Sequence, residues 1–252
     1  MKKNLIIKKK DKLAWILLNR PEKLNALTDE MMEQLGKALD ILNSEDIRVI
    51  IISGSGNSFS SGADLGMLTR LKKGEAMEKA RLWRSILDKL ESFPKPTIAA
   101  IKGYCLGCGL ELALACDFRI ASEDAVFGQP EIKLGLIPGA GAPKRLVKLL
   151  GEGKSKELIM FGREIASKEA EKMGLVTKVV PRENLEREAE KMALELAEKS
   201  PKALEKIKQV IKLISEGRYA EAGEIESTTF GELIENRKFE EKVRGKSASK
   251  PE

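Results

Sequence analysis

The sequence predicts an α/β fold followed by a helical C-terminal region, and three observations support this prediction. Up to about residue 180, short apolar runs alternate with longer segments whose apolar residues recur at helical spacing. Beyond Pro181, only the helical spacing continues. The chain has 252 residues, enough to bury a substantial core as one large domain or as a domain with a smaller lobe. Strands that alternate with helices along one chain are typical of α/β proteins.

Strands are predicted where short apolar runs end at turn-forming residues. The run 13–19 ends at the turn signal 19-NRP-21, and 48-RVIIIS-53 is dense in β-branched residues before a glycine-rich loop. The predicted strands are 13–19, 48–53, 97–101, 118–121, 125–128 and 175–180.

Helices are predicted where apolar residues recur every three or four positions. In 29–43 the apolar residues at this spacing are Met31, Met32, Leu35, Leu39 and Leu42. A helix that carries Glu111 is expected to follow the glycines of 103–109. The other predicted helices are 75–92, 142–150, 154–161, 167–173, 184–199, 201–216 and 218–236.

Composition narrows the class of protein. The net charge of +6 and the pI of about 9.0 favour an anionic ligand or partner. No run of about 18 apolar residues is available to span a membrane. The first residues, MKKNLIIKKKDK, include too few consecutive apolar residues for a secretory signal peptide. We therefore expect a cytoplasmic protein with no membrane partner.

The absence of histidine excludes several catalytic mechanisms. Ser-His-Asp and Cys-His hydrolysis, histidine-ligated metals and imidazole acid/base catalysis all require this residue. Cys105 and Cys108 form a CxxC motif, but Cys116 is the only other cysteine, so a four-ligand zinc site of cysteines and histidines cannot form. In this apolar stretch, free cysteines are expected to pack as small hydrophobic residues, and no metal is predicted.

Three glycine-rich stretches resemble nucleotide-binding loops, but each departs from the motif. The third glycine of GxGxxG is replaced in 54-GSGNSF-59, 107-GCGLEL-112 and 139-GAGAPK-144. No GxxxxGK[ST] motif occurs. A dinucleotide or P-loop site is therefore not predicted.

The loops 60-SSGADL-65 and 106-LGCG-109 each follow a predicted strand and consist mostly of small residues. Two such loops can direct two backbone N–H groups at a developing oxyanion, although plain connecting turns would look the same. Glu111 lies in the apolar run 110-LELALACD-117, where a carboxylate requires a hydrogen-bonding partner or a raised pKa. A buried pair with a lysine or arginine is the alternative.

These segments, read together, resemble the enoyl-CoA hydratase/isomerase (crotonase) family. The resemblance is carried by 18-LNRPEKLNAL-27, 60-SSGADL-65, 103-GYCLGCGLELALACDFRIA-121, 127-FGQPEIKLGLIPGAGAPKRL-146 and 161-FGREIASKEAEKMGLVTKVV-180. It covers roughly residues 10–235 in order. It implies a crotonase-type spiral of strand–strand–helix repeats over 1–195, and a helical oligomerisation region over 196–252 that builds trimers.

The resemblance also implies an acyl-CoA substrate and a role for particular residues. Glu111 and Glu131 match the two glutamates of the hydratases, and the backbone N–H groups of Ala63 and Cys108 match the oxyanion hole. The expected substrate-binding residues are Lys23, Leu24, Ser61, Asp64, Leu65, Gly109 and Gly139. The implied reaction is the reversible hydration of a trans-2-enoyl-CoA. It needs no cofactor, and coenzyme A is part of the substrate. The implied assembly is a homo-hexamer, a dimer of trimers.

Two features depart from the family pattern, and two other functions stay open. Cys108 stands where glycine or alanine is common, and the segment 237–252 lacks the usual aromatic-containing helix end. One alternative is double-bond isomerisation of an enoyl-CoA. The other is RNA binding through the basic helix 202-KALEKIKQVIK-212, but its lysines alternate with glutamate and apolar residues, and only 4% of the chain is aromatic. No nucleic-acid partner is therefore expected.

Overall fold

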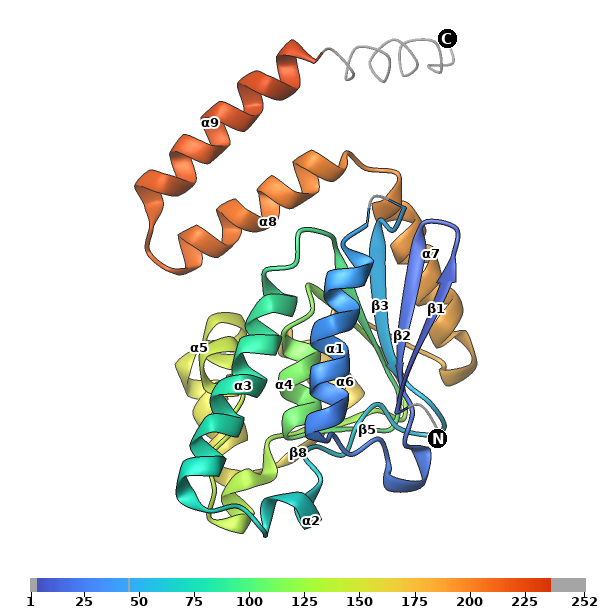
Figure 1. Ribbon diagram of the computed structural model, residues 1–252, viewed down its shortest axis with the longest axis vertical. Coiled ribbons are helices and arrows are strands. Elements are labelled where there is room, and N and C mark those ends of the chain that lie inside the picture. Colours follow the sequence, from blue (N-terminus) through green and yellow to red (C-terminus); the bar gives the residue numbers. More distant parts are fainter. Residues whose placement is uncertain (1–3, 45, 237–252) are drawn as a thin grey trace. The chain divides into compact units, whose positions relative to one another are not determined.

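The computed structural model describes residues 4–44 and 46–236 (Figure 1). The chain divides into two compact units between Glu198 and Lys199. Within the described residues, no helix has both the length and the apolar character needed to cross a membrane.

A six-stranded sheet forms the centre of the first unit. Its strands, in spatial order, are β1 (Leu5–Lys10), β2 (Leu13–Leu18), β3 (Val49–Gly54), β4 (Thr97–Ile101), β6 (Phe118–Ser122) and β9 (Lys178–Val180). The β1 strand is antiparallel to β2, and every other neighbouring pair is parallel. Parallel strands need long crossover connections, which the intervening helices supply.

Both faces of the central strands β2, β3, β4 and β6 are buried. Successive side chains of a strand point to opposite faces. Thus Ile16 joins the core cluster that contains residues of α1 (Asp29–Leu42) and α3 (Lys73–Glu91), whereas Trp15 joins the cluster that contains residues of α7 (Leu185–Ala197). Figure 1 shows α1 and α7 on opposite sides of β1, β2 and β3. Burial on both faces explains why the strands are almost continuously apolar in sequence.

A second sheet of three short strands leads to the predicted catalytic residues Glu111 and Glu131. It consists of β5 (Tyr104–Leu106), β7 (Val126–Gly128) and β8 (Glu164–Ala166), with β5 and β7 parallel. Two strand–strand–helix repeats contribute to both sheets. In β4–β5–α4 and β6–β7–α5, the first strand belongs to the large sheet and the second to the small one. The helices α4 and α5 span Cys108–Leu114 and Ala142–Phe161.

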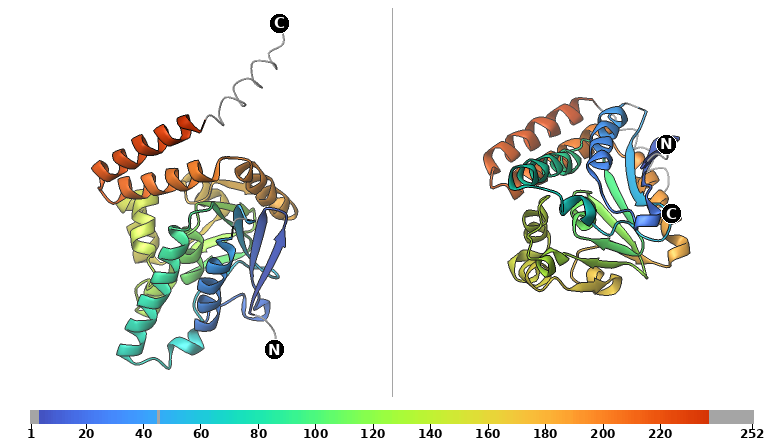
Figure 2. Two further views of the ribbon diagram at one scale, coloured as in Figure 1. Left: turned by 45° about the horizontal axis from the view of Figure 1, so that its top comes forward. Right: turned by 60° about the horizontal axis from the view of Figure 1, so that its bottom comes forward.

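The remaining elements are short connections and the helices of the second unit. The first unit also has α2 (Leu65–Leu68), α6 (Ser167–Lys172) and 3-10 turns at Pro21–Lys23, Pro130–Leu134 and Arg182–Asn184. In the second unit, α8 (Pro201–Ser215) packs along α9 (Tyr219–Glu235), as both views in Figure 2 show.

The predicted α/β fold with C-terminal helices is confirmed, with several differences in detail. In the part of the chain that the structure describes, the strands β1, β5 and β8, the helix α2 and the three 3-10 turns were not predicted. The predicted helices 142–150 and 154–161 form one element with a break at Gly151, where φ is +77°. The predicted strand 175–180 begins only at Lys178, because Leu175 and Val176 are core residues in the preceding turn. The segment 237–252 lies outside the described residues.

Candidate active site

Two parallel strands of the small sheet bring the two glutamates together. In the register of β5 and β7, Leu106 is opposite Gly128, so both strands end at the same edge. The N–H of Gly107 donates to the carbonyl of Gly128 at 3.0 Å, just before each chain turns away. The chain after β5 enters α4, which carries Glu111, and the chain after β7 reaches Glu131 within three residues. A carboxylate oxygen of each glutamate and the Cys108 Sγ lie within 4.8 Å of one another.

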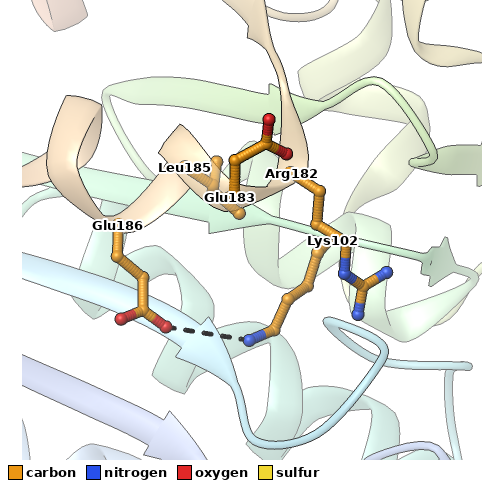
Figure 3. Close-up of a pocket in the computed structure, with 5 residues that line it drawn as sticks. All are labelled: Lys102, Arg182, Glu183, Leu185 and Glu186. Atoms are coloured by element: carbon orange, nitrogen blue, oxygen red, sulfur yellow. Dashed lines mark ion pairs between the residues drawn. The ribbon is translucent and has the colours of Figure 1, made fainter.

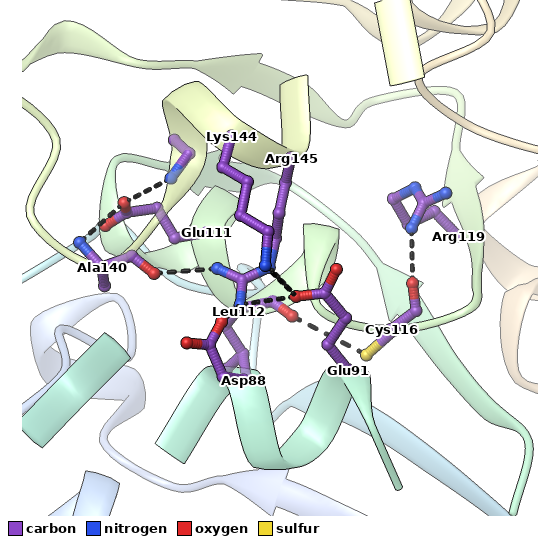
Figure 4. Close-up of polar contacts among 10 residues, drawn as sticks. Asp88, Glu91, Glu111, Leu112, Cys116, Arg119, Ala140, Lys144 and Arg145 are labelled. Atoms are coloured by element: carbon purple, nitrogen blue, oxygen red, sulfur yellow. Dashed lines mark hydrogen bonds and ion pairs between the residues drawn. The ribbon is translucent and has the colours of Figure 1, made fainter. Parts of the chain in front are cut away.

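Glu111 is fully buried and is held at both carboxylate oxygens. Its Oε1 accepts hydrogen bonds from the backbone N–H groups of Ala140 (2.8 Å; Figure 4) and Ala142 (2.9 Å). Its Oε2 accepts a hydrogen bond from the Cys108 thiol at 3.1 Å. These donors replace the water lost on burial, so no lysine or arginine partner is needed. The sequence-based alternative of a buried ion pair is therefore wrong for Glu111.

Glu131 has a different environment. Its Oε1 accepts a hydrogen bond from the side-chain amide of Gln129 at 3.0 Å, whereas its Oε2 is buried and has no partner among the described residues. A Cβ at Gly107 would lie 2.8 Å from Glu131 Oε1, so only glycine lets the carboxylate approach this closely. Burial, with a smaller contribution from the negative charge of Glu111, raises the pKa of Glu131 from 4.5 to about 7. At neutral pH, Glu131 can therefore either give or take a proton.

The Cys108 thiol stays protonated. Burial, followed by the negative charge of Glu111 and the hydrogen bond to it, raises the pKa of Cys108 well above its usual range. The thiol is thus a hydrogen-bond donor and not a reactive thiolate. Cys108, Glu111 and Glu131 are close enough to ligate a metal ion. However, both Glu111 oxygens already accept hydrogen bonds, so this set of groups is better suited to moving protons.

The two predicted oxyanion donors come from neighbouring loops. Ser60 accepts a hydrogen bond from the Leu106 N–H at 3.0 Å, so the chain leading to Ala63 runs beside the end of β5. A Cβ at Gly62 would lie 3.7 Å from the Cys108 nitrogen, which places this loop against the start of α4. Within residues 4–44 and 46–236, neither the Ala63 N–H nor the Cys108 N–H donates to a protein acceptor. Both are free to bind a substrate oxygen.

The residues expected to bind coenzyme A form one exposed cluster. The Ser61 N–H donates to the Leu24 carbonyl at 2.9 Å, which joins the two predicted segments, Lys23–Leu24 and Ser61–Leu65. Leu24 and Leu65 are 42% and 54% exposed, so both side chains are accessible to a ligand. Asp64 forms an ion pair with Arg20 at 3.1 Å, and the hydrogen bond from Arg20 lowers its pKa.

The two predicted glycines lie at close approaches. Gly109 is buried, and a Cβ there would lie 2.7 Å from the Ser60 carbonyl oxygen, so its observed role is to let α4 pack on that loop. Gly139 immediately precedes Ala140, and a Cβ there would lie 3.7 Å from Ala80 of α3. Contact of either glycine with a substrate stays a prediction.

Several known proteins that are similar to this chain in sequence and fold are named enoyl-CoA hydratases. The profile of the family described as Enoyl-CoA hydratase/isomerase matches residues 8–249. The crotonyl-CoA hydratase of Syntrophomonas wolfei is 42% identical over 75% of this chain and 74% of its own length. The short-chain-enoyl-CoA hydratase of Clostridium acetobutylicum is 37% identical over 92% of this chain and 89% of its own. The crystal structure of an enoyl-CoA hydratase from Bacillus anthracis superposes with a TM-score of 0.92 at 34% identity, covering 98% of this chain and 97% of that one.

The chain belongs to the enoyl-CoA hydratase/isomerase family. The resemblance drawn from the sequence motifs is therefore confirmed, and so is the crotonase-type fold. The structure brings together Glu111, Glu131 and Cys108, and Ala63 follows Gly62, which lies against the start of α4. Their roles in this member of the family stay predictions.

Sequence reasoning did not single out three residues that support the two glutamates. Gln129 is fully buried beside Glu131, and its position directly after the apolar run 125–128 could have indicated this burial. Arg145 is buried against the loop that binds Glu111. Its cationic side chain, at the end of 138-PGAGAPKR-145, gave no indication of burial in the sequence. Ala140 contributes only its backbone, which no sequence pattern identifies.

A hollow that includes none of the candidate site residues is lined by Lys102, Arg182, Glu183, Leu185 and Glu186 (Figure 3). Its volume is about 430 Å³. Lys102 faces Glu186 at 3.9 Å, and Arg182 pairs with Asp124. Because these opposite charges offset one another, the hollow has no net attraction for an anion and is not assigned to coenzyme A.

Proposed function

We propose that this protein catalyses the reversible hydration of trans-2-enoyl-CoA thioesters to 3-hydroxyacyl-CoA. The observation that carries the proposal is the convergence of Glu111 and Glu131 within 4.8 Å, beside two unpaired backbone N–H groups. Two carboxylates at this separation can hold one water molecule between them. The addition of water across a double bond requires a base at one carbon and an acid at the next.

The proposed mechanism assigns a separate task to each group. The N–H groups of Ala63 and Cys108 hold the thioester oxygen and stabilise the negative charge that develops there. Glu111 takes a proton from the bound water as its oxygen bonds to the β-carbon. Glu131 gives its proton to the α-carbon, and the thioester enolate returns to the carbonyl form. The reaction ends with the proton on Glu111 instead of Glu131, and solvent exchange restores the starting state.

The environments of the two glutamates support this assignment. Three hydrogen-bond donors fix the orientation of the Glu111 carboxylate, as suits a group that must take a proton from one bound water. Glu131 has a pKa of about 7 and one oxygen without a partner, as suits a group that supplies a proton at neutral pH. Glu131 is therefore the better candidate for the acid.

Short, linear acyl groups are the proposed substrates, because the relatives compared above include a crotonyl-CoA hydratase and a short-chain-enoyl-CoA hydratase. Hydration of 2-enoyl-CoA belongs to fatty-acid β-oxidation, and we place the protein in such a pathway in the cytoplasm. We also infer a homo-hexamer built through the helices after residue 196. Exposed apolar side chains such as Ile207, Ile211 and Phe230 support that assembly.

A panel of acyl-CoA thioesters tests the proposal. The panel contains trans-2-enoyl and 3-enoyl thioesters of increasing chain length, with and without a β-substituent. Hydration removes the ultraviolet absorbance of the conjugated 2-enoyl group. Isomerisation of a 3-enoyl thioester creates that absorbance. The proposal predicts rapid loss of absorbance with the short 2-enoyl substrates. Turnover of the 3-enoyl substrates alone would show that the protein is an isomerase.

A further inference from the structure

A buried arginine donates a hydrogen bond to the backbone of the loop that binds Glu111. Arg145 lies in the first turn of α5, and its side chain turns back to donate from Nη1 to the Ala140 carbonyl at 2.8 Å (Figure 4). The side chain is only 3% exposed. A Cβ at Gly141, where φ is +110°, would overlap Arg145 Nη1, so the loop and the guanidinium are in direct contact.

The peptide that Arg145 holds lies between the two peptides that bind Glu111. The N–H of Ala140 belongs to the peptide before residue 140, and the N–H of Ala142 belongs to the peptide after residue 141. Both donate to Glu111 Oε1, at 2.8 and 2.9 Å. The carbonyl between them points away from Glu111, toward Arg145. If this middle peptide rotated, it would pull both N–H groups away from the carboxylate.

Arg145 is in turn fixed by two acids of α3. Its Nη2 contacts Asp88 Oδ1 at 2.6 Å, and its Nε contacts Glu91 Oε2 at 3.0 Å. Asp88 and Glu91 are three residues apart, so they lie on the same face of the helix. One planar guanidinium thus makes three separate contacts at once, which a lysine ammonium cannot reproduce. The acids also offset the cost of a cation at a helix N-terminus.

We propose that Arg145 is a positioning residue for Glu111. It fixes the 140–141 peptide so that two N–H groups stay directed at Oε1, and Oε2 remains turned toward the Cys108 thiol. Arg145 itself touches neither the substrate nor the reacting atoms in this scheme. The kinetic consequence rests on the proposed function, whereas the structural consequence does not.

The first test needs no substrate. Amide hydrogen exchange in residues 138–142 is compared between wild type, Arg145→Lys and Arg119→Lys. Arg119 is a matched control, since it is also buried and donates to main-chain carbonyls, of Leu175 and Cys116 at 2.7 Å and of Ala113 at 3.3 Å, but makes no hydrogen bond to the loop that binds Glu111 among the described residues. We expect faster exchange of the Ala140 and Ala142 amides in Arg145→Lys only. Unchanged exchange there would overturn the inference.

The second test is kinetic. Arg145→Lys should lower kcat by about 10- to 100-fold, because small misplacement of a reacting group is costly, and should leave KM within about two-fold. In a Glu111→Gln background the same substitution should lower kcat by a further factor of less than about two, because the two residues act as a unit. Losses that simply multiply, or a change confined to KM, would contradict the inference.

A third variant addresses poor folding of Arg145→Lys. Asp88 and Glu91 are partly exposed, so the double substitution Asp88→Asn with Glu91→Gln should fold. It removes the charge of both acids and thereby weakens the contacts that hold Arg145 against α3. It should produce a weaker form of the same result, with faster loop exchange and a lower kcat at unchanged KM. Wild-type exchange and kcat in this variant would count against the inference. Because exchange is measured without substrate, failure of the proposed function is distinguished from failure of this one.

Discussion

The Glu131 carboxyl should make folding stability depend on pH in a direction opposite to that of most carboxylates. Among the described residues, its Oε2 is buried without a partner, and Gln129 is the only side chain that donates to its Oε1. Burial therefore dominates and raises the pKa of Glu131 from 4.5 to about 7. The perturbation we consider is Glu131→Gln, which keeps the shape and removes the titration.

The sign follows from the protons bound in each state. Between pH 4.5 and about 7 the folded protein keeps the Glu131 proton, whereas the unfolded chain has lost it. Stability from this group is therefore complete below pH 4.5 and is lost as the pH rises through 7. The difference of 2.5 pH units (7 minus 4.5) corresponds to about 3 kcal/mol, at about 1.4 kcal/mol per unit.

The assay is chemical denaturation of wild type and Glu131→Gln at a series of pH values. From about pH 5 to about pH 8, wild type should lose roughly 2 to 3 kcal/mol more of its unfolding free energy than the variant does. The control is Glu224→Gln, at an exposed position of α9, which should follow wild type. Parallel curves for wild type and Glu131→Gln would refute the assignment of a raised pKa to Glu131.

Three further predictions concern rate and assembly. First, kcat/KM should fall tenfold per pH unit above about pH 7, for hydration and for dehydration alike. The reason is that the active form holds one proton on the Glu111–Glu131 pair, and the equilibrium constant fixes the ratio of the two rates. Activity that rises with pH would contradict this prediction. Second, Cys108→Ala should lower kcat by about 3- to 30-fold with little change in KM, since the backbone N–H remains. Cys108→Ser should restore most of the rate, and Cys116→Ala should not alter it. Third, removal of the residues after 196 should abolish assembly, measured by sedimentation, together with activity; a fully active monomer would contradict this prediction.

Hydrophobic patterning predicted the elements that are buried on a consistent face. The strand β4 was predicted with its correct bounds, because all five of its residues are apolar or small and a proline precedes them. The strand β1 was missed because its exposed edge is rich in lysine, which protects a sheet edge but hides the strand pattern. The three-residue strands β5 and β8 are too short to show any period.

The site was predictable where side-chain chemistry conflicts with its surroundings. A carboxylate among leucines and alanines drew attention to Glu111, and the motifs around it supplied Glu131. The donors to Glu111 could not be predicted, because the N–H groups of Ala140 and Ala142 depend on the path of the loop. Cys108 was predicted to pack as a small hydrophobic residue, and only the structure shows the hydrogen bond from its thiol to Glu111.

The most direct test of the central claim is to compare Glu111→Gln and Glu131→Gln in hydration and in exchange of the substrate's α-proton with solvent. Each substitution should lower the hydration rate by about 100- to 10,000-fold, and the double substitution should cost far less than the product of the two. Acyl-CoA binding should change little. Glu111→Gln should keep slow α-proton exchange, because Glu131 remains, whereas Glu131→Gln should lose exchange together with hydration. Hydration near the wild-type rate in a folded Glu131→Gln protein would contradict the two-carboxylate mechanism.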